Sequence, residues 1–148
     1  MSGTKVNSLN RSIQSTNMWL NDIQMELKWP DMERVYAATK AMLHTLRDCM
    51  IVEEVFHLSA QFPLLLKGVF FDGYDPTGKP LDVDNRNKFF SIIQDRFDKT
   101  SGLDGEVITR ATLKVLYKRV GVGEMNDVMA NMSDDIQGLF IAAEKSLE

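Results

Sequence analysis

The chain has 148 residues, of which 44% are hydrophobic and 26% charged, so one domain with one hydrophobic core is expected. Its 17 basic and 21 acidic residues give a formal charge of −4, which disfavours a nucleic-acid partner. A single cysteine leaves no disulfide within the chain and favours a reducing cytoplasm. The sequence has no apolar run near the roughly 18 residues of a transmembrane helix and no apolar secretory signal. We therefore expect a soluble, cytoplasmic protein without a membrane partner.

Helical periodicity starts near Asn10 and defines the first half of the chain. Residues 1–9 are small and polar, and we expect them to be flexible. From Asn10 onward, apolar side chains recur every three or four residues, which predicts an amphipathic helix. Pro30 ends this helix, because the residue before a proline is pushed out of the α region. Asp31 then provides a side-chain cap for a second helix.

Two shorter helices are predicted to follow. One begins near Val52, with Glu53 and Glu54 in its first turn, where acidic groups suit the helix dipole. Pro63 opens the other, since proline is well tolerated at the first helical position. Residues 64–70 are apolar on nearly every side of this helix, which is typical of a buried element.

A long loop separates this half from a second set of helices. Residues 72–80 contain two glycines and two prolines, so no regular element is expected there. Helical patterning resumes at Phe89, and Asp104 and Ser133 are predicted to cap later helices. The glycines in residues 121–123 separate the two helices between those caps.

The two halves match one another when the chain is shifted by 70 residues without a gap. Glu54 then aligns with Glu124 and Gly68 with Gly138, and apolar positions remain apolar. This register predicts two similar four-helix units packed against each other. The predicted fold is an all-α bundle of seven or eight helices in one domain, residues 1–146. Its parts are the first unit (10–71), a linking loop (72–88), the second unit (89–144) and a cloning scar (147–148).

A series of short motifs runs through the centre of the chain in a fixed order. They are Leu46-Arg47-Asp48, Val52-Glu53-Glu54, Ala60-Gln61-Phe62-Pro63 and Asp72-Gly73-Tyr74-Asp75-Pro76. In sequence and spacing this series resembles a bacterial family known as the domain of unknown function 2267 family. The resemblance covers residues 12–141. It implies a helical bacterial protein and assigns no biochemical role.

Two segments of the linking loop resemble ligand-binding motifs, but each lacks a residue that its motif requires. Residues 73–79 have the G-x-x-x-x-G-K spacing of a phosphate loop, but Pro80 replaces the Ser or Thr that ligates magnesium. An EF-hand beginning at Asp82 fails as well, because Asn87 stands where glycine is required. We therefore predict no nucleotide, metal or other cofactor, and interpret the acidic residues as caps and turn residues.

His44, Arg47 and Asp48 share one helical face, at positions i, i+3 and i+4. A His–Asp pair can perform acid–base chemistry, and an arginine can hold an anion. The sequence offers no nucleophile to complete such a set, because Cys49 belongs to the apolar stripe. The favoured interpretation is structural, with Arg47 and Asp48 tying helix ends and loop carbonyls together. A partner or ligand surface and catalysis remain the alternatives.

Two functions follow as hypotheses. The favoured one is a non-enzymatic protein-interaction module, able to self-associate, with Arg47, Asp48, Tyr74 and the loop at its contact surface. The alternative is a small-molecule or metal binder with a site between the two units, around the same side chains. No catalytic residue is predicted. The candidate binding residues are His44, Arg47, Asp48, Gln61, Asp72 and Tyr74.

Overall fold

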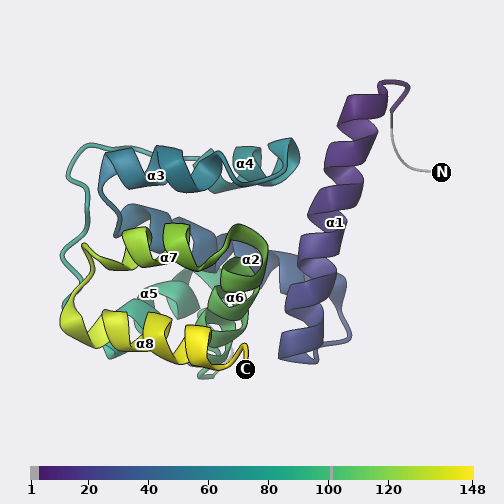
Figure 1. The fold of residues 1–148 in the computed structure, drawn as a ribbon. Coiled ribbons are helices and arrows are strands. Elements are labelled where there is room, and N and C mark those ends of the chain that lie inside the picture. The colour runs from purple at the N-terminus through teal and green to yellow at the C-terminus, as the bar shows by residue number, and fades with distance from the viewer. Residues whose placement is uncertain (1–3, 101) are drawn as a thin grey trace.

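The computed structural model describes residues 4–100 and 102–148 (Figure 1). These residues form eight helices and no strand, which confirms the predicted all-α bundle. Within the described residues, no helix combines the length and apolar composition needed to cross a lipid bilayer. The helices are α1 (Asn7–Leu27), α2 (Met32–Asp48), α3 (Val52–Ser59), α4 (Leu64–Phe71), α5 (Arg86–Phe97), α6 (Gly105–Val120), α7 (Val122–Met129) and α8 (Asp134–Lys145).

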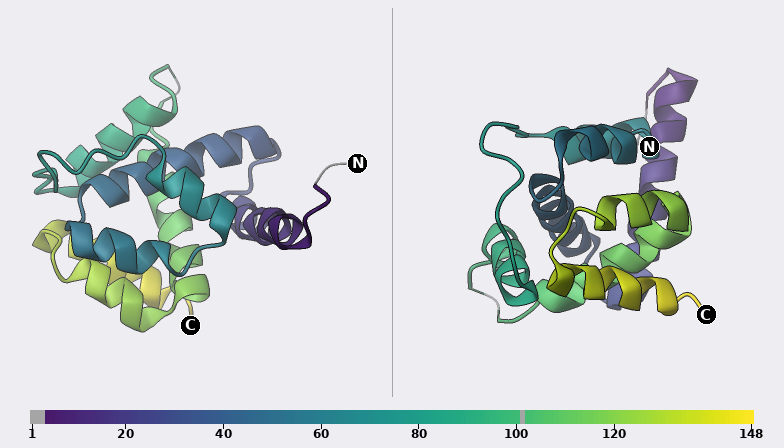
Figure 2. Two further views of the ribbon diagram at one scale, coloured as in Figure 1. Left: turned by 90° about the horizontal axis from the view of Figure 1, so that it is seen from above. Right: turned by 60° about the vertical axis from the view of Figure 1, so that its left-hand side comes forward.

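The helices α2 and α6 form the centre of the bundle. The first contacts α1, α4, α5 and α6, and the second also contacts α1, α5, α7 and α8. Both carry fully buried apolar side chains, among them Val35, Met42 and Ile108. The pair α3–α4 lies on one side of α2, with α5 and α8 towards the other side (Figures 1 and 2). At the edge stands α1, whose amino-terminal half extends past the rest of the bundle.

The first helix begins at Asn7, three residues before its predicted start. The cause is local, because the Asn10 side chain accepts a hydrogen bond from the backbone N–H of Thr4 at 2.7 Å and also donates to the Thr4 carbonyl. This exchange closes the turn ahead of the helix. Of the residues predicted to be flexible, 7–9 belong to α1, and 1–3 lie outside the described residues.

Side-chain caps explain some helix starts and not others. Asp31 accepts a hydrogen bond from the Glu33 backbone N–H at 3.0 Å, as predicted for the start of α2. Asp104 and Ser133 occupy the positions before α6 and α8, but neither side chain makes the predicted capping bond. Asn85 caps α5 instead by accepting from the Lys88 N–H at 2.9 Å. This cap starts α5 three residues before the expected Phe89.

The helix α4 is only half buried, which corrects the prediction of a buried element. Leu66 and Phe70 are buried in the core, with 2% and 0% of their surface exposed. In contrast, Leu64 and Leu65 are 60% and 45% exposed. An apolar run shows that a helix can be buried on every side. How many sides of a helix are covered depends on how many other helices pack against it. Here α1 and α2 pack against α4, and the side that carries Leu64 and Leu65 stays exposed.

Two of the four corresponding helix pairs begin 70 residues apart, whereas α1 and α5, and α2 and α6, begin 79 and 73 residues apart. The helices α3 and α7 begin at residues 52 and 122, and α4 and α8 begin at 64 and 134. The hydroxyl groups of Thr39 and Thr109, also 70 residues apart, each donate at 2.8 Å to a carbonyl four residues earlier. The internal repeat itself stays a prediction.

Candidate functional site

Arg47 and Asp48 form a buried charged cluster at the carboxyl end of α2. Both residues are at most 4% exposed. The Arg47 Nε donates to Asp48 Oδ1 at 2.9 Å, and its Nη1 donates to the carbonyls of Phe70 and Asp72 at 2.9 and 3.0 Å. The guanidinium also lies over the Tyr74 ring, 5.0 Å from its centroid. Arg47 thereby satisfies carbonyls at the carboxyl end of α4, where the helix provides no donor.

Asp48 connects the same cluster to the second half of the chain. Its Oδ2 accepts from Arg96 of α5 at 2.9 Å, and its backbone carbonyl accepts from the Leu81 N–H at 2.7 Å. Arg96 also donates to the Thr45 hydroxyl at 3.3 Å. Each oxygen of the buried Asp48 carboxylate therefore has an arginine partner. Asp48 therefore holds α2, α5 and the linking loop together.

His44 belongs to this junction as a hydrogen-bond donor. Its Nε2 lies 2.6 Å from the Val69 carbonyl, so Nε2 carries the proton in this contact. Burial is the main cause that lowers the pKa of His44 below 6.5, and the charges of Arg47 and Lys40 lower it further. The imidazole is consequently neutral at pH 7, and it anchors α4 through its backbone.

The structure brings five of the six predicted site residues together. His44, Arg47 and Asp48 meet Asp72 and Tyr74 at the carboxyl end of α4. Gln61 lies apart from them, exposed in the turn that precedes the other end of α4. The burial of Arg47 and Asp48 corrects one expectation, since a buried pair does not form a contact surface.

Cys49 follows this cluster and is not a reactive group. It is 7% exposed, and burial raises the pKa of its thiol to about 12. The nearby Asp48 carboxylate raises the pKa further. Because the thiolate is the nucleophilic form, the thiol is inert at neutral pH. This agrees with the sequence interpretation of a buried structural cysteine.

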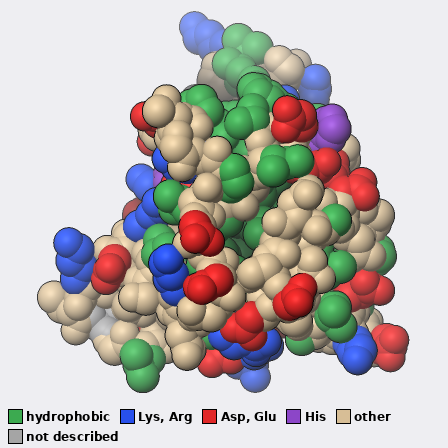
Figure 3. Space-filling view, turned by 90° about the vertical axis from the view of Figure 1, so that its left-hand side faces the viewer, with side chains coloured by type: hydrophobic (Ala, Val, Ile, Leu, Met, Phe, Trp, Pro, Cys, Tyr) green, Lys and Arg blue, Asp and Glu red, His purple; other side chains and the backbone are tan. Residues whose placement is uncertain are grey.

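The acidic linking loop does not assemble a metal site in the described part of the chain. No group of three or more His, Cys, Asp or Glu side chains there could hold a metal ion. Asp75 instead accepts from the Thr77 backbone N–H at 3.0 Å, and this bond lowers the pKa of Asp75 below 3.8. Figure 3 shows the face along which this loop passes, where acidic and basic side chains are interspersed with exposed apolar ones.

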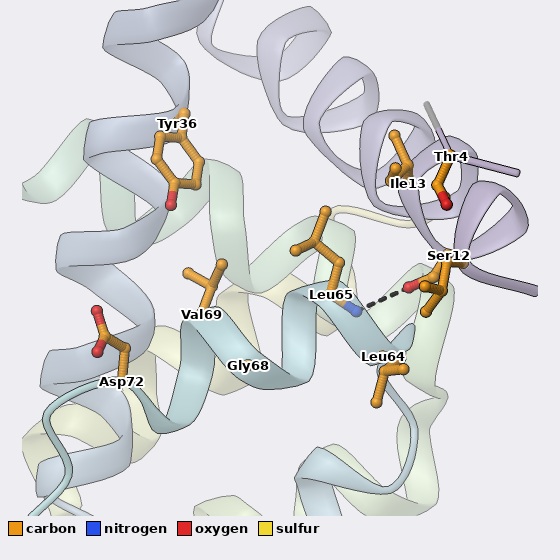
Figure 4. Close-up of a pocket in the computed structure, with 10 residues that line it drawn as sticks. Thr4, Ser12, Ile13, Tyr36, Leu64, Leu65, Gly68, Val69 and Asp72 are labelled. Carbon is orange, nitrogen blue, oxygen red and sulfur yellow. Dashed lines mark hydrogen bonds between the residues drawn. The ribbon is translucent and has the colours of Figure 1, made fainter. Parts of the chain in front are cut away.

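An open apolar cleft lies next to the junction and was not predicted. This α1–α4 groove has a volume of about 540 Å³ and is bounded by α1, α2 and α4 (Figure 4). Leu65 and Val69 of α4 point into it, facing Ile13 of α1 and Tyr36 of α2. The other residues that line it are Thr4, Leu9, Ser12, Leu64, Gly68 and Asp72.

One hydrogen bond joins the two helices on either side of the α1–α4 groove. The Ser12 hydroxyl of α1 accepts from the Leu65 backbone N–H in the first turn of α4, at 2.7 Å. Pro63, at the cap position of α4, provides no side-chain acceptor. Ser12 therefore satisfies an N–H group that has no partner within its own helix. The only sequence signal for the groove is the triple leucine at 64–66, which has more apolar surface than one helix face can bury.

Together these features define an all-α bundle with a buried charged junction and an adjacent open apolar groove. A family model described as "Uncharacterized conserved protein (DUF2267)" matches residues 16–139, and the chain belongs to this family. The match covers most of the chain and confirms the resemblance read from the sequence. No curated protein matches the chain.

Proposed function

We propose that the protein is a non-enzymatic interaction module that binds an amphipathic helix of a partner protein in the α1–α4 groove. The exposed leucines of α4 carry this proposal, because they border a concave apolar cleft, and such clefts are where proteins commonly bind other molecules. Leu64 and Leu65 are 60% and 45% exposed, and Leu9 on the opposite wall is 42% exposed. A cleft bounded by two helices with a third at its base suits helix-in-groove recognition.

The charged junction supports this role as a positioning device. Hydrogen bonds from His44 and Arg47 fix the carbonyls of Val69, Phe70 and Asp72, and so hold the end of α4 that borders the groove. The Asp72 carboxylate lines the groove there and suits a basic group on the bound helix. Gln61 and Tyr74 extend the proposed contact surface at the two ends of α4.

The contacts of the titratable groups favour binding over catalysis. His44 donates to a carbonyl, Asp48 is held by two arginines, and the Cys49 thiol is buried. Each group is committed to a structural contact, whereas a general base needs reach to a substrate proton. The single cysteine supports a location in a reducing cytoplasm, and the net charge of −4 supports a partner other than nucleic acid.

The volume of the groove favours a second candidate, a small apolar ligand. Ligand pockets commonly measure about 300–1,000 Å³ and combine apolar walls with a few polar groups. The groove has about 540 Å³, with the Tyr36 and Asp72 side chains at its α2 side. This candidate places the ligand within the first unit. The groove therefore takes the place of the ligand site that we expected from the sequence between the two units.

A display library of amphipathic helical peptides tests the proposal against three versions of the protein. Leu65→Glu places a charge in the groove at an exposed position, so the fold should tolerate it. Ile141→Glu is the matched control, since Ile141 is 46% exposed on α8. We expect peptides that bind wild type and Ile141→Glu, with at least tenfold weaker binding to Leu65→Glu.

Peptide binding that is unaffected by Leu65→Glu would contradict the groove as the contact surface. Medium-chain alcohols and fatty acids test the second candidate in a thermal-shift assay. Such a ligand at about a hundred times its dissociation constant stabilises the fold by about 2.7 kcal/mol. A stabilisation that is lost in Leu65→Glu, in the absence of any peptide binder, would favour the small-ligand candidate.

A further inference from the structure

Two glutamates from different halves of the chain face one another where α3 packs against α7. Glu54 and Glu124 are each the third residue of their helices. The α3 and α7 helices are in contact, and after burial the charge of the Glu54 carboxylate is the largest influence that raises the pKa of Glu124. One oxygen of each, Oε2, is buried and has no hydrogen-bond partner in the described part of the chain. Buried polar atoms in native proteins rarely lack partners.

A single proton resolves this arrangement. Two ionised carboxylates at close range repel one another, and each lacks a donor for its buried oxygen. A proton on Glu124 provides an O–H donor for the Glu54 carboxylate across the α3–α7 contact. Burial is the main cause that raises the pKa of Glu124 above 4.5, followed by the Glu54 charge. The direction of this shift agrees with the geometry.

The other charged groups near Glu54 and Glu124 do not remove the need for a shared proton. Asp127, on the same helix as Glu124, also raises the pKa of Glu124, and His57 of α3 opposes it. The His57 Nδ1 lies 3.5 Å from Glu54 Oε1, but its side chain is 65% exposed. Glu53, the remaining charge on α3, is exposed.

The charges on α6 and α8, which also pack against α7, are engaged elsewhere or exposed. On α6, Lys114 and Lys118 pair with Glu26, Arg119 with Asp22, and Arg110 with Glu106. On α8, Asp135 pairs with Arg86, and Glu144 accepts from Asn126. Asp134 and Lys145 are exposed at the two ends of α8.

We propose that Glu54 and Glu124 form a proton-sharing pair that makes the docking of α3 on α7 sensitive to pH. With one proton present, the pair joins the two helices. Loss of that proton to solvent leaves two facing carboxylates, which loosen α3 from α7. The glutamate pair joins the two halves of the chain, and its sensitivity to pH does not depend on what the α1–α4 groove binds.

The sign of the pH dependence follows from linkage. A carboxyl group whose pKa is raised in the folded protein binds an extra proton there, between its unfolded and folded pKa values. The contribution of the pair is fully present below the unfolded pKa of about 4.5 and is lost as the pH rises through the folded pKa of Glu124. Wild-type stability and the protection of α3 should therefore fall across that window.

Glutamine variants test the pair, because glutamine keeps the shape and removes the titration. We expect Glu124→Gln to match wild type at pH 4 and to melt about 2–4 °C higher at pH 8. Hydrogen exchange of the α3 amides should slow in the same variant at pH 8. Glu53→Gln is the matched control, since Glu53 precedes Glu54 and is exposed. It should follow wild type at every pH.

Carboxyl carbon NMR of the wild-type protein provides the direct measurement. The proposal requires that Glu124 titrates above 4.5 and that Glu54→Gln moves this midpoint downward. An ordinary midpoint for Glu124 in the wild type would overturn it. A zinc-dependent stabilisation reversed by a chelator and lost in Glu54→Gln would also overturn it, because the pair would then hold a metal ion.

Discussion

Replacement of Arg47 by methionine measures how strongly the buried junction holds the bundle. Methionine keeps much of the aliphatic volume but removes a positive charge and three hydrogen bonds, to Asp48, Phe70 and Asp72. Asp48 then keeps Arg96 as its remaining charged partner. Removal of one partner from a buried ion pair costs about 3–5 kcal/mol, because the other charge stays buried. That is a large part of the roughly 5–15 kcal/mol that stabilises a folded domain.

Urea denaturation at pH 7, followed by circular dichroism, gives the free energy of unfolding directly. For a chain of this length, about 2–4 °C of melting temperature accompanies each kcal/mol, so Arg47→Met should melt roughly 10 °C lower. Arg96→Met is the comparison, since Arg96 reaches the same carboxylate but its side chain is 34% exposed. It should cost about 1 kcal/mol, as expected for a partly solvated pair.

The double variant Arg47→Met/Asp48→Asn separates the ion pair from simple loss of packing. Removal of both charges leaves no uncompensated carboxylate, so its cost should be smaller than the sum of the two single costs. A coupling of about 1–3 kcal/mol is expected for residues in direct contact. A loss below about 1 kcal/mol in Arg47→Met, or strict additivity in the cycle, would refute a structural role for this junction.

Two further predictions concern close packing and thiol burial. A Cβ at Gly105 would lie 2.3 Å from the Phe90 carbonyl oxygen, so Gly105→Ala should destabilise the fold by about 2 kcal/mol or more in urea denaturation. Gly102→Ala, where a Cβ meets open space, is the control and should be nearly neutral. Cys49 should react with a disulfide reagent at pH 8 more than roughly 100-fold slower in the native than in the unfolded protein. Fast native labelling would show that the thiol is accessible.

Sequence periodicity was sufficient to predict the helices, because a 3.6-residue apolar repeat and its breakers act locally. Pro30 and Asp31 mark the first helix boundary, and the glycines and prolines of residues 72–80 mark the loop. The structural interpretation of Arg47 was also accessible, because an arginine on a mostly buried helix face needs internal acceptors. The sequence does not identify those acceptors, since the carbonyls of Phe70 and Asp72 come from another helix.

Tertiary packing alone decided which surfaces are open and which charges meet. The triple leucine at 64–66 is apolar throughout, and only the placement of α1 leaves Leu64 and Leu65 exposed and creates the groove. Likewise, Glu54 and Glu124 occupy equivalent positions in the 70-residue register, but only the packing of α3 on α7 brings them together. Helix formation depends on neighbours three or four residues away. The two main walls of the groove, on α1 and α4, and the two glutamates come from segments far apart in the chain, so the groove and the pair emerge only when the chain folds.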